Sequence, residues 1–204
     1  MGCDKAPHDT AVPFLDHLMG VSRVLQNWGE PQAVCDAGLF HSIFGTELFQ
    51  DYSVDFKQRP QIQKLIGERA EFLAYVFCIM DLASLDATMC DPDGQHSILA
   101  RQDQGGHRVP LTDQQYRDLI TVQLADWLEQ VERYAQLTDP KLGWQPGDAW
   151  KHRRTGYRRM AEKLGGKYLQ AWRDTYAREP VATRHLSNDV TPPVQHVNKR
   201  VVVG

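Results

Sequence analysis

Apolar residues recur at helical spacing along most of this 204-residue chain, and glycine or proline residues separate one periodic stretch from the next. Gly29 suits the left-handed conformation that closes a helix, and Pro31 suits the first turn of the helix that follows. Residues 72–80 are apolar on nearly every side, which predicts a buried central helix. The predicted helices cover residues 14–28, 31–44, 60–66, 72–80, 112–134 and 149–164.

This pattern predicts an all-α fold with one helical core at residues 13–134. Residues 135–180 are expected to form a C-terminal helical extension that packs on this core through an apolar face. Residues 84–110 are rich in glycine, proline and polar residues, which predicts a long loop. Residues 1–12 and 181–204 lack periodicity and are expected to be flexible termini.

Composition and charge exclude several classes of partner. The net charge of −3 gives no global reason to expect nucleic acid or a membrane surface as a partner. The first residues lack an apolar signal core, and no window approaches 18 continuous apolar residues, so neither secretion nor membrane spanning is expected. Four cysteines without a CxxC spacing favour a reduced, cytoplasmic setting. A homo-oligomer remains compatible with the sequence.

Two histidines and one aspartate lie in apolar helical patterns and need an explanation. His41 lies in the middle of an apolar run that stops at Gly45, and His17 begins the inward face of the first helix. Asp126 lies inside another apolar helix, where a carboxylate is costly unless it is paired or bound to a cation. A lone histidine of this kind is more often a hydrogen-bonded core residue, but the trio together predicts a metal site.

Other candidate ligands rank lower. Asp81 directly follows the central helix and is a second acidic candidate, although a residue at a helix end is more often a cap. His96 and His107 lie in the predicted loop, where histidines are mostly solvated.

Positive charge is concentrated near the C-terminal end of the chain. Residues 150–178 contain nine Lys and Arg residues against Glu162 and Asp174, a local charge of +7, so the remaining residues sum to −10. Such an asymmetry is either a solvated helix face or a surface that binds an anion. We expect one or more of Arg153, Arg154 and Arg158 to point toward the histidines and to hold an anionic group of a small substrate.

The order of these motifs resembles the HD-domain superfamily, and most closely its RelA/SpoT-type alarmone hydrolase branch. Four stretches are similar to that branch in the right order, across about residues 13 to 134: residues 13–17, 39–42, 66–70 and 122–128. The resemblance implies an all-α HD-like bundle in which His17, His41 and Asp126 bind a divalent metal ion, with Mn or Fe expected. The segment around His41 is also similar to an uncharacterised family with a His-Ser/Ala-x-Tyr/Phe-Gly-Thr-Glu/Asp motif.

Several positions depart from the alarmone hydrolase pattern. Ser42 stands where the superfamily has the aspartate of its His-Asp dyad, and that carboxylate bridges two metal ions in dinuclear members. Gly45 and Thr46 stand where the branch has a catalytic Glu-Asp pair, and Gln130 replaces its asparagine. Glu47 is the one carboxylate near His41 that could act as a general base.

Three functions remain open at the level of the sequence. The first is a metal-dependent hydrolase of a small anionic substrate, with Glu47 as the catalytic base and with Ser42, Thr46, Gln130, Arg153, Arg154 and Arg158 as substrate contacts. The second is a mononuclear non-haem Fe(II) oxygenase or lyase, because two histidines and one carboxylate also form the facial triad of such enzymes. The third is an HD-like ligand-binding or regulatory module without turnover.

Overall fold

The fold is all-α, as the sequence predicts, and the computed structural model describes residues 13–90, 96–134 and 154–178. Its helices and strands are α1 (Phe14–Asn27), α2 (Gln32–Leu39), the 3-10 helix η1 (Phe56–Gln58), α3 (Arg59–Ile66), α4 (Glu68–Ile79), α5 (Leu82–Thr88), β1 (Ser97–Leu99), the 3-10 helix η2 (Gln102–Gln104), β2 (Arg108–Pro110), α6 (Asp113–Tyr134), α7 (Arg154–Leu164) and α8 (Gly166–Ala177). The predicted flexible termini at 1–12 and 181–204 lie outside the described residues.

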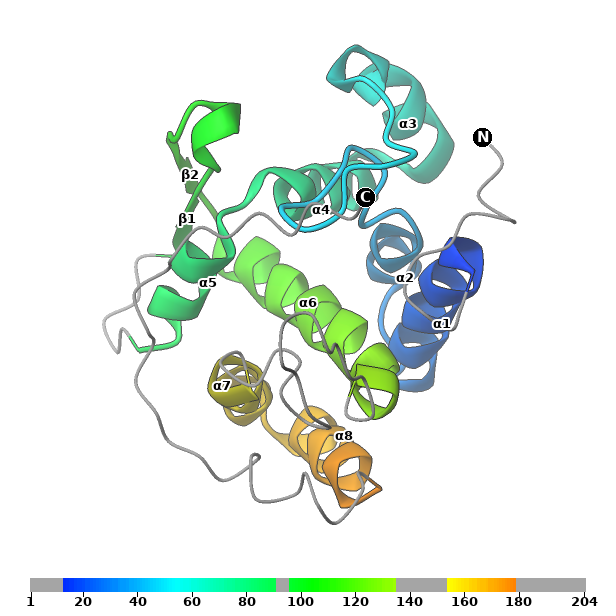
Figure 1. Cartoon of the computed structure of the whole chain (residues 1–204), viewed down its shortest axis with the longest axis vertical. Coiled ribbons are helices and arrows are strands. Elements are labelled where there is room, and N and C mark those ends of the chain that lie inside the picture. The colour runs from blue at the N-terminus through cyan, green and yellow to red at the C-terminus, as the bar shows by residue number, and fades with distance from the viewer. Residues whose placement is uncertain (1–12, 91–95, 135–153, 179–204) are drawn as a thin grey trace, which may run out of the picture.

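Helix α6 is the central element of the fold. It runs across the middle of the molecule, with α1, α2 and α4 on one side and α7 and α8 on the other (Figure 1). Its buried residues face both sides, since Leu124 and Ala125 are fully buried and Trp127 is 2% exposed. Buried side chains of α7 and α8, among them Met160 and Tyr176, belong to the same hydrophobic cluster. The two C-terminal helices therefore pack on the core through α6.

Helices α1 and α2 approach each other closely at Gly38. A Cβ atom at this position would collide with Leu25 Cδ1, so a larger residue here would displace the Leu25 side chain. Val21 and Leu25 of α1 are fully buried at the same contact. This close packing brings the segment after α2 beside the beginning of α1.

Helix α2 ends at Leu39, earlier than the predicted residue 44, and His41 lies in a series of hydrogen-bonded turns that follows. The carbonyl oxygen of Gly38 is bonded by His41 Nδ1 at 2.6 Å, although a continuing helix would offer this oxygen to the backbone N–H of Ser42. A side chain that takes a carbonyl of the last turn competes with helical hydrogen bonding. The helix prediction was therefore wrong for residues 40–44.

Residues 84–90 and 96–110 form more regular structure than the predicted loop, while residues 91–95 lie outside the described residues. They include most of α5 and an antiparallel hairpin, in which Ile98 pairs with Val109. Ile98 is fully buried, and a bridge between Met80 and Ala100 joins the hairpin to the end of α4. Asp81 caps α5 by accepting a hydrogen bond from the Ser84 backbone N–H at 2.8 Å. Among the described residues, no helix is long and apolar enough to cross a membrane.

Candidate metal centre

A cavity of about 160 Å³ lies where α1, α4, α6, α7 and the segment after α2 meet. Its polar wall includes His17, His41, Ser42 and Asp126. Much of the remaining wall is apolar or aromatic, formed by Leu48, Phe49, Phe77, Met80, Leu82 and Trp127. An engineered cavity of about 150 Å³ holds one benzene molecule, so the space matches a small organic molecule or part of a larger one.

The side chains of His17, His41 and Asp126 converge, as the sequence predicts. His17 Nε2 lies 3.1 Å from Asp126 Oδ1, and His41 Nε2 lies 3.6 Å from the same oxygen. One ligand atom from each of the three side chains lies within 4.8 Å of the other two. The two imidazole rings are nearly perpendicular, with centroids 5.2 Å apart. Residues separated by up to 109 positions thus share one point at the cavity wall.

The Nδ1 atom of each histidine contacts an acceptor that orients the ring. Glu129 Oε2 lies 2.6 Å from His17 Nδ1, and the Gly38 carbonyl oxygen lies 2.6 Å from His41 Nδ1. Metal-binding histidines in proteins nearly always donate their second ring N–H to a carboxylate or a backbone carbonyl in this way. Both Nε2 atoms are thereby directed toward Asp126.

The environments of the two histidines have opposite effects on their pKa values. Burial lowers the pKa of His41, which favours the neutral ring that a metal ion requires. Burial also lowers the pKa of His17, but hydrogen bonds and charge interactions with Asp126 and Glu129 outweigh it and raise the pKa to about 9. In the metal-free protein, the His17 proton supplies the positive charge between two carboxylates.

This donor set fits a single divalent metal ion. Two imidazole nitrogens and one carboxylate oxygen bind Mn, Fe or Zn, and three protein ligands leave positions open for water or substrate. The metal-ligand cluster found among the described residues contains these three side chains. His17 and His41 are 1% and 2% exposed, so these two ligands would shield a bound ion from bulk water.

Other predicted site residues also line the cavity. Ser42 is 4% exposed, and Thr46 uses its hydroxyl to accept the Phe49 backbone N–H at 3.0 Å. Glu47 is exposed at the cavity wall, and its Oε2 accepts the Leu82 backbone N–H at 2.9 Å. Gln130 donates from Nε2 to Asp126 Oδ1 at 3.2 Å. Loop contacts therefore hold Thr46 and Glu47 at the cavity.

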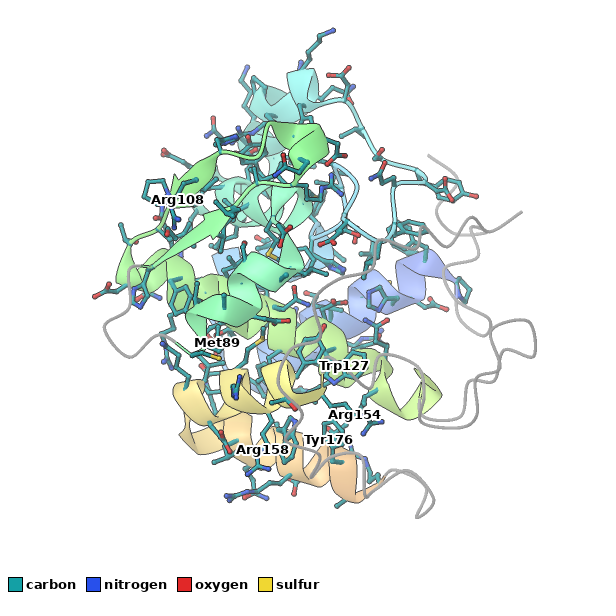
Figure 2. The ribbon with its side chains drawn as sticks, turned by 60° about the vertical axis from the view of Figure 1, so that its left-hand side comes forward. Met89, Arg108, Trp127, Arg154, Arg158 and Tyr176 are labelled. Carbon is teal, nitrogen blue, oxygen red and sulfur yellow. The ribbon has the colours of Figure 1, made fainter. Side chains whose placement is uncertain are left out.

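The arginines of α7 do not take the predicted position. Arg158 bonds Glu162 at 2.9 Å, and its guanidinium lies 6.0 Å from the ring centroid of Trp172 on α8. Arg154 is buried and lies 5.1 Å from the ring centroid of Tyr176, also on α8 (Figure 2). No lysine or arginine is among the described residues that line the cavity.

For Arg154 and Arg158 the expected direction toward the histidines is wrong, because both side chains turn toward α8, a helix that the sequence pattern did not predict. Arg153 lies outside the described residues. Helix α7 instead contributes Tyr157 to the cavity wall, and this ring stacks on Trp127 with centroids 4.6 Å apart.

Sequence reasoning missed two residues that contact Asp126 or its histidine partner. Glu129 holds His17, and Gln123 Nε2 lies 3.4 Å from Asp126 Oδ2. Both lie three positions from Asp126 on α6, and residues three apart share one face of a helix. This spacing was the available signal for both residues.

Comparison with known proteins gives a match to a family of unknown function. Residues 1–82 match the model of a family described as a domain of unknown function, DUF6817. This segment contains His17 and His41 but not Asp126, Glu129 or the rest of α6. No curated protein and no solved structure matches the chain.

Proposed function

We propose that this protein is a mononuclear metal-dependent hydrolase that acts on a small molecule at the His17, His41 and Asp126 cluster. One observation carries the proposal: two buried Nε2 atoms meet one carboxylate oxygen, while both Nδ1 atoms are held by other acceptors. A divalent ion bound there would act as a Lewis acid and lower the pKa of a coordinated water molecule. Ser42 in place of the bridging aspartate favours one ion rather than two.

The protein residues have distinct roles in this proposal. His17, His41 and Asp126 bind the ion, and Glu129 and the Gly38 carbonyl fix the orientation of the imidazole rings. Glu47 is the proposed general base, since it is the carboxylate besides Asp126 among the described lining residues. Glu47 Oε2 accepts the Leu82 backbone N–H, which leaves Oε1 to accept a proton from the attacking water molecule.

The proposed substrate is small and carries a phosphate or similar anionic group that binds the ion directly. The metal ion is the proposed counter-charge, because no cationic side chain is among the described lining residues. The hydroxyl of Ser42 is the proposed additional contact, since it is buried at the wall beside His41. Apolar lining residues such as Phe77 and Trp127 would contact the rest of the molecule.

Metal analysis and a hydrolysis assay test this proposal. Protein purified without chelator should contain about one Mn, Fe or Zn ion per chain, and Asp126→Asn should contain far less. The metal-loaded protein should release nitrophenolate from p-nitrophenyl phosphate or bis(p-nitrophenyl) phosphate, and Glu47→Gln should slow this release without lowering metal content. A chain that binds no metal would contradict the proposal and favour a ligand-binding module without turnover.

A mononuclear Fe(II) oxygenase or lyase is the second candidate, and the lining of the cavity favours it. The wall is rich in aromatic and aliphatic side chains, and no lysine or arginine is among the described lining residues, which suits an apolar organic substrate better than an anion. Two histidines and one carboxylate also form the facial triad of such enzymes. Iron bound in preference to other metals, together with oxygen consumption by the reduced protein, would favour this candidate over hydrolysis.

A further inference from the structure

Two glutamines flank Asp126 on α6 and both donate to its carboxylate. Gln123 Nε2 lies 3.4 Å from Asp126 Oδ2, and Gln130 Nε2 lies 3.2 Å from Asp126 Oδ1. Gln123 is 2% exposed and Gln130 is 8% exposed, and both side chains form part of the cavity wall. The spacing of three and four positions from Asp126 places all three residues on one face of the helix.

The carboxylate of Asp126 determines the orientation of the side-chain amides of Gln123 and Gln130. An ionised carboxylate accepts hydrogen bonds and cannot donate them, so the NH₂ group of each glutamine must face Asp126. The carbonyl oxygen Oε1 of each side chain is therefore directed elsewhere. Both of these oxygens are buried and have no hydrogen-bond partner among the described residues.

Buried carbonyl oxygens are nearly always paired in folded proteins, so two unpaired oxygens beside one cavity need a donor. The neighbouring Trp127 indole does not supply it, because its N–H is bonded to the Tyr176 hydroxyl at 2.8 Å. Asp126 is an acceptor, and Phe77 and Met80 offer no donor from their side chains. The Tyr157 hydroxyl lies 3.4 Å from Gln123 Nε2, so it contacts the donor end of this amide and not Oε1. The cavity that both glutamines border is the described space from which a ligand could bring one.

We propose that the substrate presents N–H or O–H groups to Gln123 Oε1 and Gln130 Oε1 while its reacting group lies at the metal ion. The substrate class is thus a small molecule that carries hydroxyl, amide or amine hydrogens close to the group that binds the metal. This inference rests on the proposed function, because the metal centre determines where the reacting group lies. The two glutamines are specificity residues, since they select a substrate by its donors.

A pair of metal-binding probes tests the inference. Benzohydroxamic acid binds a metal ion through two oxygens and carries an N–H donor, and N-methylbenzohydroxamic acid lacks this N–H. Both are titrated calorimetrically into the Zn²⁺-loaded wild-type protein after its metal content has been measured. We expect the N–H compound to bind about tenfold more tightly, which is the size of one well-formed hydrogen bond.

Variants separate the hydrogen bond from the bulk of the added methyl group. Gln123→Met and Gln130→Met keep the length of the side chain and remove the carbonyl, so the preference should fall below about threefold in at least one of them. Gln170→Met is the matched control, since Gln170 is exposed on α8 and bonds Asp174. The Gln170→Met variant should prefer the N–H probe over the N-methyl probe by the same factor as the wild type.

The outcomes distinguish this inference from the proposed function. A wild-type protein that retains no Zn²⁺ would overturn both. A protein that holds Zn²⁺ but binds the two probes equally, or binds neither, would overturn the inference alone. A preference that survives unchanged in both methionine variants would also overturn it, because the selectivity would then come from the shape of the cavity.

Discussion

Two groups of charged side chains, one on each side of α6, differ in what surrounds them. His17 and Asp126 line the cavity, where their side chains are 1% and 13% exposed, and Glu129 contacts His17 Nδ1. Arg158 and Glu162 pair on the surface of α7, where their side chains are 40% and 46% exposed.

The difference in exposure indicates which of the two charged groups is more informative about function. An exposed ion pair such as Arg158 with Glu162 contributes at most about 1 kcal/mol, and many exposed pairs contribute nothing measurable. Buried carboxylates are costly unless they are paired or bound to a cation, so their presence beside two histidines needs a specific partner. Substitutions and pH changes can test whether the buried group depends on a metal ion and whether the surface pair is independent of it.

Asp126→Asn should have the largest effect. A neutral amide of similar size is a poor metal ligand, so metal affinity should fall by more than about 100-fold, beyond the range typical of losing an outer hydrogen-bond partner. The helical circular dichroism should stay close to that of the wild type. Asp103→Asn, at an exposed residue of η2, is the control and should keep wild-type affinity. Unchanged metal content in Asp126→Asn would remove this residue from the ligand set.

Glu129→Gln should lower metal affinity by about 10- to 100-fold, since Glu129 orients His17 rather than binding the ion. The amide can still contact His17 Nδ1, but it has no charge to make the ring more basic. Competition with a chelator of known affinity measures the loss. An effect as large as that of Asp126→Asn would indicate that Glu129 binds the ion directly.

The stability of the metal-free protein should depend on pH through His17. Its pKa of about 9 lies above the ordinary value of 6.5, so the folded state binds the proton more tightly. This contribution, roughly 3 kcal/mol, is fully present below pH 6.5 and is lost as the pH rises through about 9. Urea unfolding between pH 6 and 9.5 measures it. The loss should be smaller in Glu129→Gln, and an equal loss in both proteins would contradict the assignment.

The pKa of His41 predicts a change at the acidic end of the range. Because this pKa is lowered in the fold, the unfolded chain binds the proton more readily below about pH 6.5. His41 therefore reduces the stability of the metal-free protein as the pH falls. A wild-type stability that rises steadily from pH 7 to pH 5 beyond that of His41→Phe would contradict this sign.

Gly20→Ala should have a moderate effect on the metal centre. A Cβ at Gly20 would lie 2.7 Å from Glu129 Oε1 and 2.8 Å from its Cγ, so Glu129 must move away from its present position. Alanine itself favours a helix interior by about 1 kcal/mol over glycine. We therefore expect metal affinity to fall several-fold without loss of helix. The double variant with Glu129→Gln should be no weaker than the weaker single variant, and additive losses would show that Gly20 acts elsewhere.

Arg158→Ala should have the smallest effect. The residue pairs with Glu162 and lies over Trp172 on α8, away from the cavity lining, so stability should change by about 0.5 kcal/mol or less and metal affinity should not change. Urea unfolding and the chelator competition measure both. A loss of hydrolysis or of metal binding in this variant would show that Arg158 of α7 contributes to the site.

Long helices with clear periodicity were predictable from the sequence, and elements that depend on tertiary contacts were not. The ranges of α1 and α6 agree closely with the pattern, because caps, glycines and apolar spacing act locally. The hairpin was missed because its strands have three residues each, and Ile98 is buried through contacts that join the hairpin to the end of α4. The early end of α2 depends on one side-chain hydrogen bond of His41.

The candidate site divides in the same way. The convergence of His17, His41 and Asp126 was predictable because each polar side chain lies in an apolar helical pattern, where it needs a partner. The direction of Arg154 and Arg158 was not predictable, since it depends on the position of α8 against α7. The spacing to Asp126 was enough to predict that Glu129 lies on the same face of α6. Its hydrogen bond to His17 was not predictable, because this bond depends on the packing of α1 against α6.

The distance along the chain between the histidines and Asp126 has a consequence for folding. His17 and His41 leave the ribosome well before α6, at about 5–20 residues per second, so the binding site is incomplete during the early part of synthesis. Contacts that close a chain segment of this length form late and slowly compared with local helices. An ion that needs all three side chains would therefore not assist folding of the N-terminal helices during synthesis, and it would slow unfolding of the finished protein instead.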